Sequence, residues 1–452
     1  MTKQKTINPI RIWSKFILEL TTPLKIASGN KDFLSDSLLV KDVNGLPFIP
    51  ASSIAGILRH ALEEETANDL FGCQTVNDGW GSSVLLTSGH LLNRDGTVLE
   101  GILGTDEIND FVLRFMRLPI RQHVRINEKG VSEKGGKYDE EILYKGARFC
   151  FEMELLQNDG HTKSMQQLVS ILTNKSTRIG GGSRKGFGGF SVISAYMRVF
   201  DLEKEEDLSV YLKKSSSLNY PLPSGSFDAL NIEQVAPPKL YTTYRLTLEP
   251  NDTVLFGAGF GSSEADVISV EEDVVTWDAN GRGSFQDKQL LIPASSVKGA
   301  LAHRVAYHYN RIKGIYADKL SVEDYKQYVG SNNSAVNALF GSEIKGVQKR
   351  GNTLFSDVFI DASREQSKTF LNHISIDRFT GGAMPGVLFT EQVDYLNGCI
   401  LTMEIQVANT IDEEVLSAFE YALNDLCSER LPLGGAVNRG HGIFKGSYSK
   451  IN

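Results

Sequence analysis

The segment IPASSIAGIL at residues 49–58 decides the fold, because the chain contains a second version of it, IPASSVKGAL, at residues 292–301. Two further segments recur in the same order. LFG occupies residues 70–72 and 339–341, and the glycine-rich GGGSRKGFGGF at 180–190 is matched by GGAVNRGHGIF at 434–444. A shared order with variable spacing indicates two copies of one domain whose loops differ in length.

Between the two copies lies a stretch of different composition. Residues 201–207, DLEKEED, are highly charged, and lysine, serine, proline and glycine dominate residues 213–225. Such clusters are typical of solvated linkers. We therefore predict a first domain at residues 1–200, a linker at 201–238 and a second domain at 239–452.

Each copy is expected to alternate strands with helices. Residues 11–20 and 240–250 have the pattern of antiparallel strands, and Asn44-Gly45 is a strong hairpin-turn signal. A helix is predicted after each IPASS segment, with Ser52 or Ser53 as the N-cap in the first copy. Later helices are predicted at 165–172 and 415–426. This order favours an α+β fold of two tandem ferredoxin-like (RRM-like) domains, each an antiparallel sheet with helices on one face and inserted hairpins.

The composition favours a soluble, cytoplasmic protein with no membrane partner. The chain has 452 residues, 41% of them hydrophobic, and no run of 18 apolar residues that could span a membrane. The N-terminal MTKQKTINPIRIWSK lacks the apolar core of a secretory signal. The four cysteines are scattered, so neither a disulfide framework nor a zinc site is predicted. A net charge of -8 excludes a coat of positive charge but permits a local basic groove.

The glycine-rich segments are candidates for binding a phosphate-rich partner. Glycine lets backbone N–H groups approach a ligand closely, and cationic side chains in the same loops would add to the attraction. A pair of tight turns explains the glycines equally well. The cationic candidates in these loops are Arg178, Arg184, Lys185, Arg439 and His441.

The helix start after each IPASS segment is a second candidate. Gly56 and Gly299 lie early in these helices, where glycine costs about 1 kcal/mol relative to alanine, so something is expected to approach closely. The free N–H groups of a helix N-terminus would suit an anion. Close packing of the helix on the sheet would also explain both glycines.

The combination of three motifs resembles the RAMP superfamily, and more narrowly the backbone subunits of type III CRISPR effector complexes. The motifs are Asp36 ahead of a strand, G-x-P-x-I-P-x-S-S-x-x-G-x-L-R at 45–59, and R-x-G-G-G-S-R-K-G-x-G at 178–188. Both copies carry the pattern, so the chain resembles a tandem fusion of two such subunits. The resemblance implies RRM-like folds, an RNA-guided antiviral complex, and guide RNA (crRNA), target RNA and other CRISPR effector subunits as partners.

The resemblance also implies a protruding thumb hairpin in each copy. It corresponds to residues 117–148, the densest basic run, and to the segment at 373–383. A solvated loop would explain the basic run as well. The residues expected to bind RNA are Ser52, Ser53, Arg59, Arg121, His123, Arg125, Arg178, Arg184, Lys185, Ser295, Ser296, Lys298, His373, Arg378, Arg439 and His441.

Family subunits of this type cut target RNA with an aspartate ahead of the strand that leads to the I-P motif, and Asp36 holds that place. The resemblance therefore implies that Asp36 is catalytic and binds Mg²⁺ or another divalent cation. A carboxylate there could hold the metal or orient a 2′-hydroxyl for attack on the neighbouring phosphate. The second copy has several acids in the matching stretch, among which Asp273 ranks first and Asp266 next.

Three functions remain open from the sequence. The first is a backbone subunit that is also a metal-dependent endoribonuclease on guide-paired target RNA. The second is a non-catalytic RNA-binding scaffold. The third is a guide-processing endoribonuclease with His123 or His441 as acid–base group, for which no divalent ion would be needed.

Overall fold

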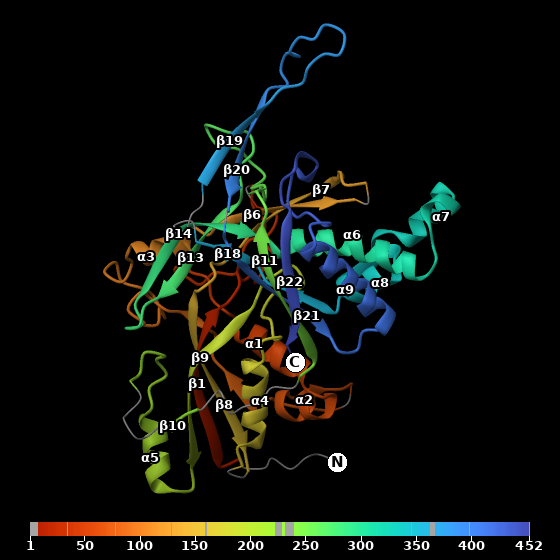
Figure 1. The fold of residues 1–452 in the computed structure, drawn as a ribbon. Coiled ribbons are helices and arrows are strands. Elements are labelled where there is room, and N and C mark those ends of the chain that lie inside the picture. Colours follow the sequence, from red (N-terminus) through yellow and green to blue (C-terminus); the bar gives the residue numbers. More distant parts are fainter. Residues whose placement is uncertain are drawn as a thin grey trace.

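The computed structural model describes residues 8–33, 35–76, 78–127, 129–158, 161–221, 228–230, 239–344, 346–361, 367–396 and 398–451. It shows two adjacent domains of similar plan (Figure 1). The main elements of the first domain are β1 (Ile10–Leu20), α1 (Ala51–Ala61), α2 (Glu64–Phe71), β2 (Cys73–Gln74), β3 (Gly79–Trp80), β4 (Val84–Leu86), β5 (His90–Leu91), α3 (Asp110–Met116), β6 (Ile120–Ile126), β7 (Ser132–Glu141), β8 (Arg148–Gln157), α4 (Lys163–Thr173) and β9 (Phe190–Asp201).

The second domain begins with β11 and ends with β22. Its main elements are β11 (Tyr241–Pro250), β12 (Thr253–Val254), β13 (Glu271–Trp277), β14 (Gly283–Ile292), α6 (Ala294–Ile312), α7 (Val322–Tyr325), α8 (Ser334–Phe340), β15 (Gly341–Ile344), β16 (Val347–Arg350), β17 (Thr353–Phe355), β18 (Val358–Ile360), β19 (Ser367–His373), β20 (Phe389–Tyr395), β21 (Leu401–Ala408), α9 (Glu413–Cys427) and β22 (Phe444–Ile451).

The two central sheets have the same strand order. It is β9-β1-β8-β4 in the first domain and β22-β11-β21-β17 in the second, with antiparallel neighbours throughout. This is the order of the ferredoxin-like βαββαβ fold. Apolar side chains from one sheet face pack with those of α1 and α4, and the second sheet packs likewise with α6 and α9. The predicted α+β class with two tandem ferredoxin-like domains is confirmed.

The segment predicted as a solvated linker packs against the first domain over its described part. Helix α5 (Glu205–Lys213) follows β9, and strand β10 (Asp228–Ala229) pairs with the edge of β9. Between them, Lys214 pairs with Glu152 at 2.8 Å and Leu218 is buried. The segment therefore covers part of the first sheet, while residues 222–227 and 231–238 lie outside the described residues.

A hairpin of the second domain, β13–β14, is inserted against the first domain. The Trp277 indole donates to the Gly146 carbonyl at 2.8 Å, and the Val275 N–H donates to the Lys145 carbonyl at 2.9 Å. Phe285 packs among aromatic rings of the first domain. These contacts fix the orientation of the two domains.

Arg121 is buried within the same interface and forms ion pairs there. This position corrects the expectation that Arg121 binds RNA. Its guanidinium is buried and lies 2.7 Å from the Glu272 carboxylate and 2.8 Å from that of Asp357. Burial alone would lower the pKa of Arg121, but the two carboxylates raise it. Arg121 is thus an inter-domain ion-pair partner that RNA cannot reach.

The helices after the IPASS segments begin slightly earlier than predicted. Helix α1 begins at Ala51, and Pro50 stands at the N-cap with no side-chain cap, so Ser52 and Ser53 lie in the first turn. A Cβ atom at Gly56 or Gly299 would have no neighbour within 4 Å. Close helix-to-sheet packing is therefore not the reason for these glycines, and the space above both is open.

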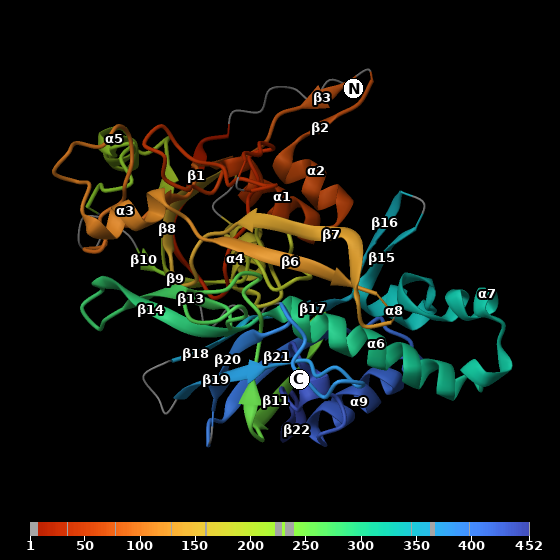
Figure 2. The same ribbon diagram turned by 90° about the horizontal axis from the view of Figure 1, so that it is seen from above.

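Each domain carries a hairpin where a thumb is expected. Strands β6 and β7 run across the molecule from the first domain towards the second (Figure 2). Strands β19 and β20 support the loop at 374–388, which projects from the body of the protein (Figure 1). None of the described helices is long and apolar enough to cross a membrane.

Candidate functional site

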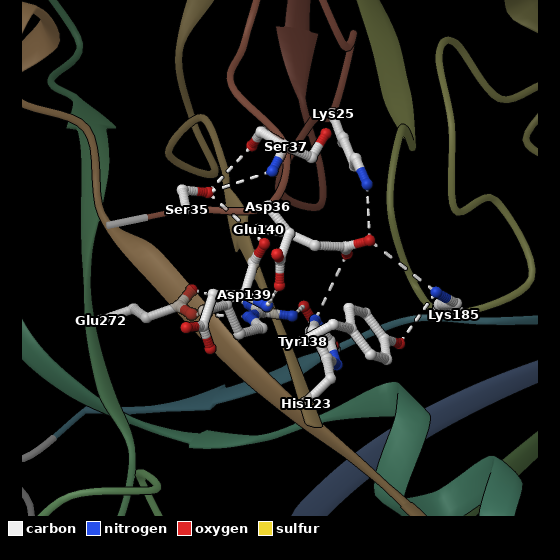
Figure 3. Close-up of polar contacts among 12 residues, drawn as sticks. Lys25, Ser35, Asp36, Ser37, His123, Tyr138, Asp139, Glu140, Lys185 and Glu272 are labelled. Atoms are coloured by element: carbon white, nitrogen blue, oxygen red, sulfur yellow. Dashed lines mark hydrogen bonds and ion pairs between the residues drawn. The ribbon is translucent and has the colours of Figure 1, made fainter. Parts of the chain in front are cut away.

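Asp36 lies on an exposed loop of the first domain and is fixed to strand β7. Its N–H donates to the Asp139 carbonyl at 3.2 Å, and its Oδ2 accepts from the Asp139 N–H at 3.0 Å (Figure 3). The other carboxylate oxygen, Oδ1, has no hydrogen-bond partner among the residues that the structure describes. The backbone thus orients the carboxylate while one oxygen faces outward.

Asp266 repeats this geometry in the second domain. Its N–H donates to the Thr390 carbonyl at 2.9 Å, and its Oδ2 accepts from the Thr390 N–H at 2.8 Å. The residue after each aspartate forms the same parallel bridge, Ser37 with Glu140 and Val267 with Glu391. Asp266 is therefore the structural counterpart of Asp36.

Asp273 occupies a different place, which reverses the order in which the sequence ranked the two acids. Its Oδ2 pairs with Arg114 of the first domain at 2.6 Å, and its Oδ1 accepts from the Lys288 N–H at 3.0 Å. Both oxygens are thus engaged at the inter-domain hairpin. Asp273 was ranked first because it directly precedes a β-branched run, and that run proves to be part of the inter-domain hairpin.

A buried glutamate lies next to the residue that holds each aspartate. In the first domain, Glu140 is 5% exposed and contacts Lys25, His123 at 3.4 Å and Lys185 at 3.8 Å (Figure 3). Burial alone would raise the pKa of Glu140, but His123 and the two lysines lower it to about 2. The carboxylate of Glu140 is therefore ionised, and its contacts connect the glycine-rich loop with the thumb strands.

The second domain has the same arrangement around Glu391, which is 2% exposed. His373 lies 2.8 Å and His441 3.6 Å from its carboxylate, and Arg439 pairs with it as Lys185 pairs with Glu140. His373 also stacks on Phe389, as His123 stacks on Tyr138. Sequence reasoning missed both glutamates, although aligning the Tyr138-Asp139-Glu140 and Phe389-Thr390-Glu391 triplets would have found them.

Several residues predicted to bind RNA have internal roles instead. His123 and His441 are buried, so neither ring is placed to act on an RNA strand. Arg59 donates to the Gly72 carbonyl and the Asn68 side chain. Burial lowers the pKa of Arg178 to about 10, and its guanidinium donates to Ser356 and to a nearby carbonyl. By contrast, the thumb residues Arg125 and Arg378 are exposed, Arg125 lying 3.7 Å from Glu133.

A cationic cluster forms at the seam between the domains, and we call Arg184, Lys185 and Lys298 the seam cluster. The glycine-rich loop of the first domain docks on the start of α6, where a Cβ at Gly186 would lie 2.5 Å from that of Ala294. Burial, together with repulsion from Lys185 and Arg184, lowers the pKa of Lys298 to about 8.

This seam cluster combines residues from the two copies of the domain. The half-buried Ser295 and Ser296 lie in the same helical turn as Lys298, and the exposed Ser52 lies in the first turn of the equivalent helix of the first domain. Among the described residues, Lys185 is the one member with a carboxylate within ion-pair distance, that of Glu140, so an anion at the seam would relieve the remaining repulsion. The sequence analysis included all three residues among those expected to bind RNA, but only the fold shows that they lie together.

Comparison with known families supports the duplication seen in the fold. A family model of the RAMP superfamily matches residues 17–191 and 283–445, one region in each domain. A comparison with curated proteins found no match. The superfamily includes endoribonucleases, and membership supports a CRISPR-associated RNA-binding subunit. The repeated fold and the two matched regions together show that the chain belongs to the RAMP superfamily.

Proposed function

We propose that the chain is a backbone subunit of a type III CRISPR effector complex that binds guide RNA and cleaves the paired target RNA at Asp36 and Asp266. The observation that carries this proposal is the repeated aspartate geometry. In both domains an exposed carboxylate is fixed by one backbone N–H at the base of a thumb hairpin. A scaffold that only bound RNA would have no need to repeat an exposed, oriented carboxylate.

Guide-RNA binding is assigned to the seam cluster and to the open helix starts at Gly56 and Gly299. Phosphates would neutralise the mutual repulsion of Arg184, Lys185 and Lys298, and the release of counterions would add to the affinity. The net charge of -8 does not oppose this, because phosphate binding needs only a local cationic stripe.

The role proposed for each aspartate is to bind or orient groups at the scissile phosphate. The residues that the structure describes contain no group of three metal-ligating side chains. Asp36 would therefore hold Mg²⁺ alone, with RNA phosphate and water as the other ligands, which suits an ion that usually binds through one or two carboxylates. When bound, the ion would supply charge neutralisation at the phosphate. Glu140 and Glu391 would keep the strand carrying the Asp-binding N–H in place.

The proposal is tested by reconstituting the complex with a guide RNA and a labelled target. We expect two cleavage positions in a matched target, none in a mismatched one, and loss of both when EDTA removes divalent ions. A complex that binds the matched target but leaves it intact would show that the protein is a scaffold. Cleavage of a guide precursor in EDTA would indicate a processing enzyme.

A further inference from the structure

A cavity of about 670 Å³ lies at the contact between β13–β14 and the first domain. The residues that matter among those lining it are Glu19, Lys145, Arg148, Gln286, Phe359 and Asp361. It shares no lining residue with the seam cluster and includes neither aspartate site. Its volume falls in the range of small-molecule sites and exceeds what a single inorganic ion needs.

Lys145 contributes a positive charge without an ion-pair partner to this cavity. Its ammonium lies 4.8 Å from the centre of the Phe359 ring, and it has no ion pair or hydrogen bond among the described residues. Burial lowers the pKa of Lys145, although the charges of Asp357 and Glu19 oppose the shift. Removing an ammonium partly from water without a carboxylate in ion-pair contact costs free energy, which an anion bound in the cavity would offset.

The nearby carboxylates are already engaged with other groups. Asp357 accepts from Arg121 at 2.8 Å and from the Ala294 N–H at 2.8 Å. Glu19 pairs with Arg148 at 2.8 Å, and Arg148 also lies over the Trp277 ring. Asp361, which also lines the cavity, has an interaction of its own. The charge of Lys145 is therefore available to an anion that enters from outside.

The second domain does not repeat this feature. Tyr144 and Tyr395 occupy equivalent places, because the preceding residues, Leu143 and Asp394, bridge the equivalent Leu24 and Val254. The residue after Tyr395 is the buried Leu396, whereas the residue after Tyr144 is Lys145. The fold thus accepts an apolar side chain at this position, so a lysine is not required for packing.

We propose that this cavity binds the phosphate group of a nucleotide, with Lys145 as the counter-charge and the Gln286 amide as a second donor. Ammonium and amide N–H groups are the donors that phosphate oxygens accept from, and the cavity has room for the attached sugar and base. The phosphate could belong to a free mononucleotide or to an RNA strand of the complex. Both sources present the same chemistry to Lys145.

Protection of lysines against an amine-acylating reagent, read by mass spectrometry, tests this site on the full chain. The probes are AMP with the free protein and guide RNA with the assembled complex. We expect AMP to slow acylation of Lys145 at least tenfold while the exposed Lys319 reacts unchanged. Protection by RNA but not by AMP would assign the site to an RNA phosphate. If neither probe protects Lys145, the proposal is wrong.

Two variants and a control complete the test. Lys145→Gln and Lys145→Leu should each weaken binding of the protecting probe at least tenfold, and Lys145→Leu copies the second domain, so it should fold. Lys319→Gln should bind as the wild type does. Unchanged binding by both Lys145 variants would overturn the proposal. Because cleavage is not measured, this outcome is independent of the fate of Asp36 and Asp266.

Discussion

The two aspartate sites share their geometry but differ in what surrounds them. Beside Asp36, the first domain is covered by the β13–β14 hairpin, and Tyr144 is 6% exposed. The equivalent Tyr395 of the second domain is 39% exposed, and Leu371 stands where the first domain has Arg121. Each domain therefore orients its aspartate by its own fold. The inter-domain ion pairs of Arg121, which we call the clamp, have no counterpart at Leu371 of the second domain.

The clusters under the aspartates differ in a second way. Glu140 is balanced by two lysines and one histidine, and Glu391 by one arginine and two histidines. The two domains thus surround the equivalent buried glutamate with different basic side chains. This difference makes each site separately testable by substitution.

The largest effect on stability should follow from replacing Arg121 by leucine, the residue at the equivalent position of the second domain. Arg121→Leu leaves Glu272 and Asp357 buried without their cation, so it should lower the free energy of unfolding by about 3–5 kcal/mol in denaturant titration. Arg245→Leu, at an exposed pair with Glu404, should cost less than about 1 kcal/mol. Equal losses would show that the clamp is not what joins the domains.

The next effect concerns the buried glutamate of the first domain. Glu140→Gln should lower the free energy of unfolding by about 2–3 kcal/mol at neutral pH. The pKa of Glu140 is depressed in the folded protein, so its contribution is present above the unfolded pKa and is lost as the pH falls towards about 2. The gap between wild type and variant should therefore close in acid, and a gap that is constant down to pH 3 would contradict this account.

The sequence predicted the fold, and it included both Asp36 and Asp266 among the candidate residues, for physical reasons that can be named. The repeated segments indicate the order of the elements, and Asp36 stands ahead of the strand that leads to the I-P motif. Asp266 was ranked second because Asp273 directly precedes a β-branched run, which lies in the β13–β14 hairpin. Arg121 was assigned to RNA because a basic run in sequence does not reveal which member is buried. The seam cluster depends on a contact between the copies, which no local pattern encodes.

A smaller effect should appear in the pH dependence of guide binding. Lys298→Ala should weaken RNA binding about tenfold, as expected for loss of one charge-assisted contact. Because the pKa of Lys298 is about 8, wild-type affinity should fall as the pH rises from 7 to 9, when the side chain loses its proton. Lys298→Arg should bind with little change over this range. An equal pH dependence in both proteins would exclude Lys298 as the cause.

The smallest effect compares the two helix-start glycines. Gly56→Ala and Gly299→Ala have open space for the new Cβ, so each should raise the free energy of unfolding by up to about 1 kcal/mol. If RNA approaches these turns closely, each variant should also bind guide RNA less tightly. Greater stability with unchanged RNA affinity would remove the helix starts from the proposed binding surface.

The central claim, that the two aspartates are equivalent cleavage sites, is tested most directly by mapping products of a labelled target in reconstituted complexes. The variants are Asp36→Ala, Asp266→Ala and, as a control, Asp273→Ala. We expect Asp36→Ala and Asp266→Ala each to remove one product, slowing that cut about a hundredfold or more, and Asp273→Ala to retain both cuts. If Asp266→Ala left both products and Asp273→Ala removed one, the structural equivalence of Asp36 and Asp266 would not describe the chemistry.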